Sequence, residues 1–250
     1  MHLVLLDRWT NLDSPLHRRD PRAKVLGAAG IVVFLALSSR ALAFKLPASA
    51  ALLLGLLLLS RVPPGYGLKR ACLVLPFSGM AVASALAGAW LPGLGIRLSA
   101  GEALAIVSKS YLSALAVLLL AATTRMPELL KALEQLRVPA VFLMVVHFVY
   151  RYLFVLSEEA QHMNQALASR GGARGGWRAA AGMAAVLFAR AHARAERVHR
   201  AMLARGFHGS FPATRTWQWR AADSAYALAL GACLAAIHSA PLWFSRWYAP

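Results

Sequence analysis

The chain has 250 residues, of which 59% are apolar, well above the roughly 45–50% that is usual for soluble domains. Its formal net charge is +17 at pH 7, yet only 15% of the residues are charged, and they stand between long apolar runs. This pattern indicates a membrane protein with basic cytoplasmic loops, and it excludes a nucleic-acid binder built on one continuous basic face.

Six apolar stretches follow in chain order, and each is a candidate membrane helix. They comprise residues 25–39, 46–60, 71–96, 103–124, 138–150 and 224–245. Crossing the hydrocarbon core takes about 20 residues, so the first two stretches are short. The sequence therefore predicts an all-α, polytopic membrane protein with about five or six membrane helices and a cytoplasmic module of long coupling helices.

The two cysteines, Cys72 and Cys233, fall within the third and sixth stretches. A free thiol inside an apolar helix behaves as a small hydrophobic group. We therefore expect no disulfide framework and no cysteine-based metal site.

Basic residues are concentrated before the first stretch, between the second and third, and after the fourth. The positive-inside rule then places the N-terminus, the end of the fourth stretch and the basic segment 158–220 in the cytoplasm. A crossing by residues 138–150 would put that segment outside, so we expect this stretch of 13 residues to enter or line the membrane without crossing it. The expected location is the cell inner membrane, as a multi-pass protein with a cytoplasmic N-terminus.

The chain divides into a cytoplasmic N-terminal segment (1–24), membrane helices (25–124), a cytoplasmic coupling module (125–220) and a C-terminal membrane helix (221–250). Within the module, Pro127 and Pro139 bound a predicted short helix over residues 127–136. Two long helices are predicted from residue 141 to about 170 and from 177 to about 205. The glycine-rich break between them fits, because glycine is favoured just past a helix end.

A short pattern recurs at the ends of these two long helices. Ser169-Arg170-Gly171 and Ala204-Arg205-Gly206 each place a small residue, an arginine and a glycine in succession, 35 positions apart. The glycine permits a left-handed turn, and a guanidinium presented there can make bidentate bonds to a carboxylate on a partner protein. The alternative is helix capping alone, since a cation near a helix C-terminus complements the helix dipole. The recurrence favours partner binding.

This paired pattern resembles the two Ala-Arg-Gly signatures of the transmembrane T component of energy-coupling-factor (ECF) transporters. Residues 17–24, which read HRRDPRAK, are similar to that family's His-x-Leu-Asp-Pro-Arg-x-Lys segment, and residues 205–209, RGFHG, resemble its cobalt and nickel branch, CbiQ. Two departures are Ser169 in place of the first alanine and Arg19 in place of an aliphatic residue. From the residues themselves, Asp20 and Pro21 are a standard helix start, with an N-cap followed by proline.

The resemblance implies a non-catalytic coupling subunit of an ATP-driven importer. Arg170 and Arg205 would each contact one of two ABC ATPase subunits, and the membrane helices would hold a separate small substrate-binding membrane subunit. ATP-driven closure would pull the two helix ends together, which requires both tips on the cytoplasmic side and not far apart. Cobalt or nickel is the implied substrate, and a vitamin is the alternative.

The sequence offers less support for three other functions. The chain has no G-x-x-x-x-G-K-[ST] loop, so it is not expected to hydrolyse ATP itself. A membrane enzyme that uses the segment between Arg170 and Arg205 to act on lipid phosphates would need acidic metal ligands, and only Glu196 is acidic there. A structural membrane anchor without a transport role is a further alternative.

No metal site or cofactor is expected. His192 and His199 are seven residues apart and near one helix face, but neither is judged to have a histidine or carboxylate partner four residues away. Both also lie in an arginine-rich segment, which disfavours a cation.

Overall fold

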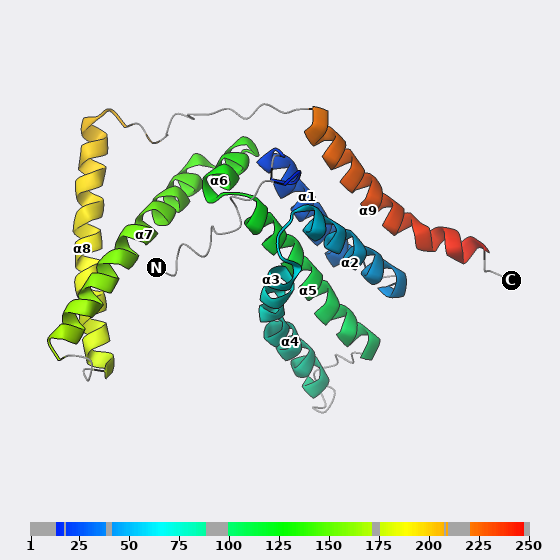
Figure 1. Cartoon of the computed structure of the whole chain (residues 1–250), viewed down its shortest axis with the longest axis horizontal. Helices are drawn as coiled ribbons and strands as arrows, with labels where there is room; N and C mark the ends of the chain where they lie inside the picture. The colour runs from blue at the N-terminus through cyan, green and yellow to red at the C-terminus, as the bar shows by residue number, and fades with distance from the viewer. Residues whose placement is uncertain are drawn as a thin grey trace. The chain divides into compact units, whose positions relative to one another are not determined.

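The computed structural model describes residues 14–17, 19–38, 42–88, 100–171, 176–207, 209 and 221–247, and over these ranges it contains helices and no strand (Figure 1). The helices are α1 (Pro21–Leu37), α2 (Leu42–Leu59), α3 (Pro64–Ala71), the 3₁₀ turn η2 (Cys72–Val74), α4 (Leu75–Gly88), α5 (Ala100–Thr123), α6 (Met126–Gln135), α7 (Ala140–Ser169), α8 (Gly176–Ala204) and α9 (Ala221–Trp247). The predicted all-α class is confirmed.

The chain folds as two compact units. The first, here called the bundle, comprises Met1–Ala132 together with Trp217–Pro250. The second, here called the hairpin, comprises Leu133–Thr216 and contains α7 and α8. The hairpin is thus an insertion in the chain between α6 and α9.

Helix α5 is the centre of the bundle, because it contacts α1, α2, α3 and α4. Side chains from four of these helices and from α9 form the buried core: Ile31, Leu35, Leu53, Ala71, Leu112, Leu115, Ala116 and Leu230. Glycine permits two of the close approaches. A Cβ on Gly67 would lie 3.3 Å from Leu57 Cδ1, and one on Gly27 would lie 2.8 Å from Leu230 Cδ2. The second distance leaves no room for a side chain at Gly27.

Two lysines join α1 and α5 reciprocally. Lys24, in the first turn of α1, donates from Nζ to the carbonyl oxygen of Thr123 at the end of α5, over 2.9 Å. Lys109 of α5 donates from Nζ to the carbonyl oxygen of Ser38, the C-cap of α1. The helices therefore lie antiparallel, and each places a cation at the C-terminal end of the other, where the helix dipole favours positive charge.

The chain is a polytopic membrane protein. Three of its described helical segments are long and apolar enough to cross a bilayer, namely Gly101–Thr123, Ala140–Ser169 and Ala221–Ser239, and Lys45–Leu59 is a shorter apolar helix. Large apolar side chains on the outside of the bundle are strongly exposed, including Leu37 (77%), Phe77 (78%) and Leu228 (73%). In a bilayer such side chains contact lipid instead of water, which removes the hydrophobic cost of their exposure.

The predicted third stretch is interrupted in the structure. Helix α3 ends at Ala71, the 3₁₀ turn η2 follows, and α4 begins at Leu75. Pro76 fits the interruption, since proline lacks the N–H group that would bond the carbonyl of Cys72 in a continuous helix, and its ring crowds that carbonyl. Both cysteines are free and exposed. Cys72 lies in η2, and Cys233 lies in α9. Residues 89–96 of this stretch, like residues 1–13 and 210–220, lie outside the described ranges.

The expectation that the fifth stretch is too short to cross the membrane is wrong. Helix α7 runs for 30 residues, and its apolar part is long enough to span. The apolar stretch ends at Tyr150 in the sequence because Arg151 follows, but residues 152–156 are again apolar. The expectation that residues 138–150 do not cross rests on the basic residues and not on this length, so it stays a prediction, as does the cytoplasmic side of the hairpin.

Candidate coupling surface

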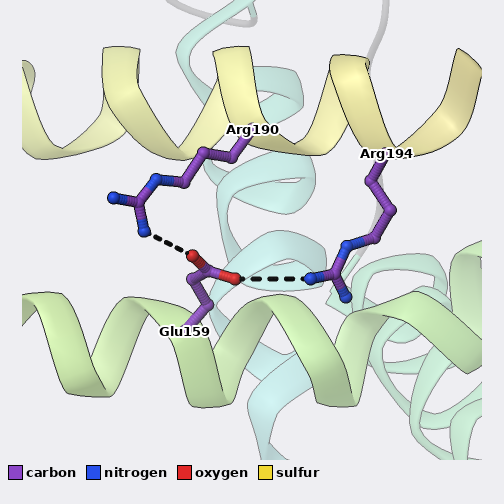
Figure 2. Close-up of polar contacts among 3 residues, drawn as sticks. All are labelled: Glu159, Arg190 and Arg194. Carbon is purple, nitrogen blue, oxygen red and sulfur yellow. Dashed lines mark hydrogen bonds and ion pairs between the residues drawn. The ribbon is translucent and has the colours of Figure 1, made fainter. Parts of the chain in front are cut away.

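Helices α7 and α8 form an antiparallel pair held by polar contacts (Figure 1). Glu159 of α7 lies opposite two arginines of α8, with Arg190 Nη1 at 2.6 Å from Glu159 Oε1 and Arg194 Nη2 at 3.8 Å from Oε2 (Figure 2). Exposed ion pairs add little to stability. One carboxylate shared by two arginines a helical turn apart nevertheless fixes the register of the two helices. Sequence reasoning overlooked Glu159, although it is one of two adjacent acids opposite an arginine-rich helix.

The described part of the hairpin has no buried core: no described residue of α7 or α8 is buried. Phe142, Trp177 and Phe188 are 67%, 85% and 75% exposed. Two helices that bury so little gain little free energy from their own contacts to offset the entropy of ordering. Cover by lipid or a partner protein would supply the burial that they lack.

The end of α7 carries the first Arg-Gly pattern. Arg170 is the C-cap, with φ −86° and ψ 13°, and Gly171 adopts a left-handed conformation with φ +76°. The Gly171 N–H donates to the carbonyl oxygen of Ala168 over 3.1 Å, and Ser169 Oγ donates to the carbonyl oxygen of Ala166 over 3.0 Å. Serine at this position therefore satisfies a carbonyl of the last turn, so its departure from alanine is compatible with the motif.

The end of α8 repeats this geometry. Gly206 has the same φ of +76°, and its N–H donates to the carbonyl oxygen of Leu203 over 3.0 Å. The Phe207 N–H donates to the carbonyl oxygen of Met202 over 3.1 Å, which completes a Schellman motif. A Cβ on Gly171 or Gly206 would meet no atom within 4 Å, so glycine is required by the backbone conformation and not by crowding.

Both signature arginines are exposed at these rigid ends. Among the residues that the structure describes, the guanidinium groups of Arg170 and Arg205 make no hydrogen bond or ion pair, and only the backbone N–H groups of these residues bond to the preceding turn. In contrast, Arg190 and Arg194 are engaged by Glu159, and Arg200 Nη2 bonds Glu196 Oε2 over 3.2 Å. Two fixed helix ends thus present guanidinium groups whose donors are available to a partner's carboxylates.

The expectation that the two tips lie close together is wrong. Because α7 and α8 are antiparallel, Arg170 and Arg205 lie at opposite ends of the hairpin (Figure 1). Helix α8 has 29 residues, so the tips are about 43 Å apart at a rise of about 1.5 Å per residue. The repeat alone does not reveal this separation, because the separation depends on α8 running back along α7. The hairpin therefore offers two separate contact points instead of one paired tip.

The second segment that resembles the ECF family, residues 17–24, begins helix α1. Asp20 is the N-cap, and its Oδ1 accepts from the Arg22 N–H over 2.9 Å, with Pro21 as the first helical residue. The predicted helix start is confirmed. Asp20 is 1% exposed, so this cap lies inside the bundle.

Comparison with protein families decides the relationship. The family model of CbiQ, described as cobalt transport protein, matches residues 13–216, which include both Arg-Gly ends and the segment 17–24. The chain belongs to the CbiQ family. CbiQ of Rhodobacter capsulatus, a cobalt transport protein, is 32% identical over 154 residues, or 60% of this chain and 63% of the relative. An uncharacterized protein of Methanocaldococcus jannaschii is 34% identical over 103 residues, or 40% of this chain and 38% of the relative. The chain therefore covers less than two thirds of either relative's length.

The structure corrects one prediction about the histidines of the hairpin, namely that His192 has no carboxylate partner four residues away. His192 does have a carboxylate partner four residues away, since its Nε2 lies 3.5 Å from Glu196 Oε1. His162 likewise lies 4.0 Å from Glu158. Each pair lacks a third ligand, because no group of three or more histidine, cysteine or acidic side chains is found within the described ranges. The geometry of these pairs fits surface ion pairing along a helix.

Proposed function

We propose that the chain is the transmembrane coupling subunit of an ECF-type ABC importer. It links ATP hydrolysis by two partner ABC ATPase subunits to uptake of cobalt or nickel through a separate, small substrate-binding membrane subunit. The observation that carries this proposal is the pair of Arg-Gly helix ends, which share one backbone geometry and leave both arginines exposed. Membership of the CbiQ family supports the transport role.

The geometry of the ends suits a protein contact better than helix capping alone. Capping requires only the glycine and a cation near the terminus. The guanidinium groups of these arginines follow the last helical residue and make no hydrogen bond to the helix carbonyls among the described residues. A rigid end loses little entropy when a guanidinium binds, which favours affinity. A separation of about 43 Å, at about 1.5 Å per residue, leaves room for a different ATPase at each tip. The proposal is therefore two separate contacts, and the closure that draws the two tips together is not part of it.

The other parts of the proposal concern the membrane. Residues 1–24 and 125–220 would face the cytoplasm of a cell inner membrane, where the ATPases are located, and the helices within 25–124 and 221–250 would lie in the bilayer. Their exposed apolar side chains, such as Phe77 and Leu228, give a surface for lipid and for the substrate-binding subunit. Chemistry on ATP would belong to the partners, in keeping with the missing phosphate-binding loop.

The proposal is tested by charge reversal at one tip. Arg205→Glu should reduce co-purification of the ATPases about tenfold or more, because a hydrogen bond to a charged group contributes about 1.5–3 kcal/mol. ATP-dependent cobalt and nickel uptake by cells that express the whole complex should fall with it, while membrane insertion is unchanged.

Arg197→Glu is the matched control for this experiment. Arg197 is an exposed arginine on the same helix, so the variant makes the same charge change two turns away from the tip. It should retain the ATPases within about twofold, the size expected for a surface substitution. Retained complex and uptake in Arg205→Glu would refute the proposal, and vitamin uptake in place of metal uptake would change the substrate.

A further inference from the structure

The chain joins the hairpin to the bundle at two places, and both places contact the start of helix α1. The chain leaves the bundle through α5 and α6 at Ala132 and returns to it before α9, which begins at Ala221. The chain itself therefore links the hairpin to the membrane helices through the end of α5 with α6 and through the start of α9. Both of these segments contact the first turn of α1.

Asp223 holds the start of α9. It lies in the first turn of that helix, and its Oδ1 accepts the backbone N–H of Asp20 over 3.0 Å. Asp20 in turn caps α1, as described above. Both carboxylates are almost fully buried, at 1% exposure for Asp20 and 4% for Asp223. A bond between residues 203 positions apart thus ties the return of the chain to the N-terminal end of α1.

Lys24 holds the end of α5. Its Nζ donates to the carbonyl oxygen of Thr123 over 2.9 Å and to that of His17 over 3.0 Å. Burial lowers the pKa of Lys24 to about 8, and the carboxylates of Glu128, Asp20 and Asp223 act in the opposite direction. The ammonium group is therefore still mostly protonated at neutral pH. Since Glu128 belongs to α6, the cation also lies within electrostatic reach of the segment that leads into the hairpin.

The junction also contains buried groups without partners. Asp20 Oδ2 and Thr124 Oγ1 are buried and have no hydrogen-bond partner among the residues the structure describes. Such groups are rare, because burial without a partner forfeits their hydration. Asp20 adjoins the start of α9, and Thr124 directly follows the end of α5. Two of the three such groups among the described residues thus lie at the two connections, and the third, Ser38 Oγ, lies at the other end of α1.

We infer that Asp20, Lys24 and Asp223 are positioning residues that fasten both connections of the hairpin to α1, so that movement of the hairpin is transmitted to the bundle helices. This inference rests on the proposed function. Loss of the fastening should leave ATPase attachment and ATP hydrolysis intact, since the Arg-Gly ends are unchanged. It should uncouple hydrolysis from uptake.

The experiment measures metal uptake per ATP hydrolysed in the full complex, reconstituted in vesicles with cobalt as the probe. Asp223→Ala removes the acceptor and the charge, and it should lower this ratio about tenfold with the ATPases still bound. Asp223→Asn keeps an oxygen acceptor of the same size and should give an intermediate ratio. Ser224→Ala, which removes the local Oγ bond to the carbonyl oxygen of Ala221, is the adjacent control and should match the wild type.

An unchanged ratio in Asp223→Ala overturns the inference. So does a parallel loss of hydrolysis and uptake that keeps the ratio constant. If Asp223→Ala does not accumulate in the membrane, Asp223→Asn decides, and a ratio equal to that of the wild type counts against the inference. A wild-type complex that takes up no metal with ATP refutes the proposed function itself, whereas an active wild type with coupled variants refutes only the positioning role.

Discussion

At the scale of single residues, Lys24 shows what a sequence can and cannot reveal. The segment 17–24 predicted the cap at Asp20, because an N-cap followed by proline is a local signal. The partners of Lys24 and Lys109 could not be predicted, since they are backbone carbonyls 99 and 71 positions away. Every residue has a backbone carbonyl, so the sequence does not indicate which carbonyl a lysine will bind.

Lys24→Met should destabilise the bundle by about 1–3 kcal/mol, because two carbonyl oxygens would lose their donor in a buried site. Thermal unfolding of the purified chain in detergent measures this as a lower Tm. Lys69→Met removes an exposed lysine of α3 and should change the Tm little. Equal Tm values for the two variants would show that the buried ammonium contributes nothing.

At the scale of helices, glycine and proline signals predicted the module well. The structure begins and ends α6, α7 and α8 within one residue of the sequence prediction. Two local signals were misjudged. Pro76 interrupts an apolar run at η2, and Arg151 does not end the apolar part of α7, although the bounds of this helix are predicted correctly. Other contacts have no local signal. The ion pairs of Glu159 depend on the register between two helices, which no single-helix pattern contains.

One glycine inside α8 and one just past its end should respond in opposite ways to alanine. Gly206→Ala forces a side chain into a left-handed conformation and should cost roughly 1–2 kcal/mol, with weaker ATPase retention because Arg205 loses its fixed end. Gly182→Ala lies within the helix in open space and should stabilise it by about 0.5–1 kcal/mol. Thermal unfolding and ATPase co-purification measure both effects. Stabilisation by Gly206→Ala would contradict the role given to its conformation.

At the scale of the whole molecule, the hairpin separates two proposed binding points that the sequence presents as a repeat. The repeat itself was visible, and so was the all-α membrane class. The distance between the tips was not, because it depends on the direction in which α8 returns along α7. Under the proposed function, two distant tips would hold two ATPases at once without either tip blocking the other.

If the two tips bind independently, substitutions at Arg170 and Arg205 should weaken ATPase binding independently. Sites this far apart, with no shared partner, should contribute additively to the binding free energy. The fold losses in ATPase co-purification caused by Arg170→Glu and Arg205→Glu should therefore multiply in the double variant. A double variant no weaker than either single one would mean that the two arginines act as a unit.

The reciprocal lysines of α1 and α5 limit which motions the bundle can make. Sliding one helix past the other by a single turn, about 5.4 Å, would withdraw both ammonium groups from their carbonyls at once. A polar bond broken in apolar surroundings is costly, and here two would break in the same step. Helices α1 and α5 are therefore expected to move as one rigid unit. Displacement during a transport cycle would then occur in the helices that pack against them.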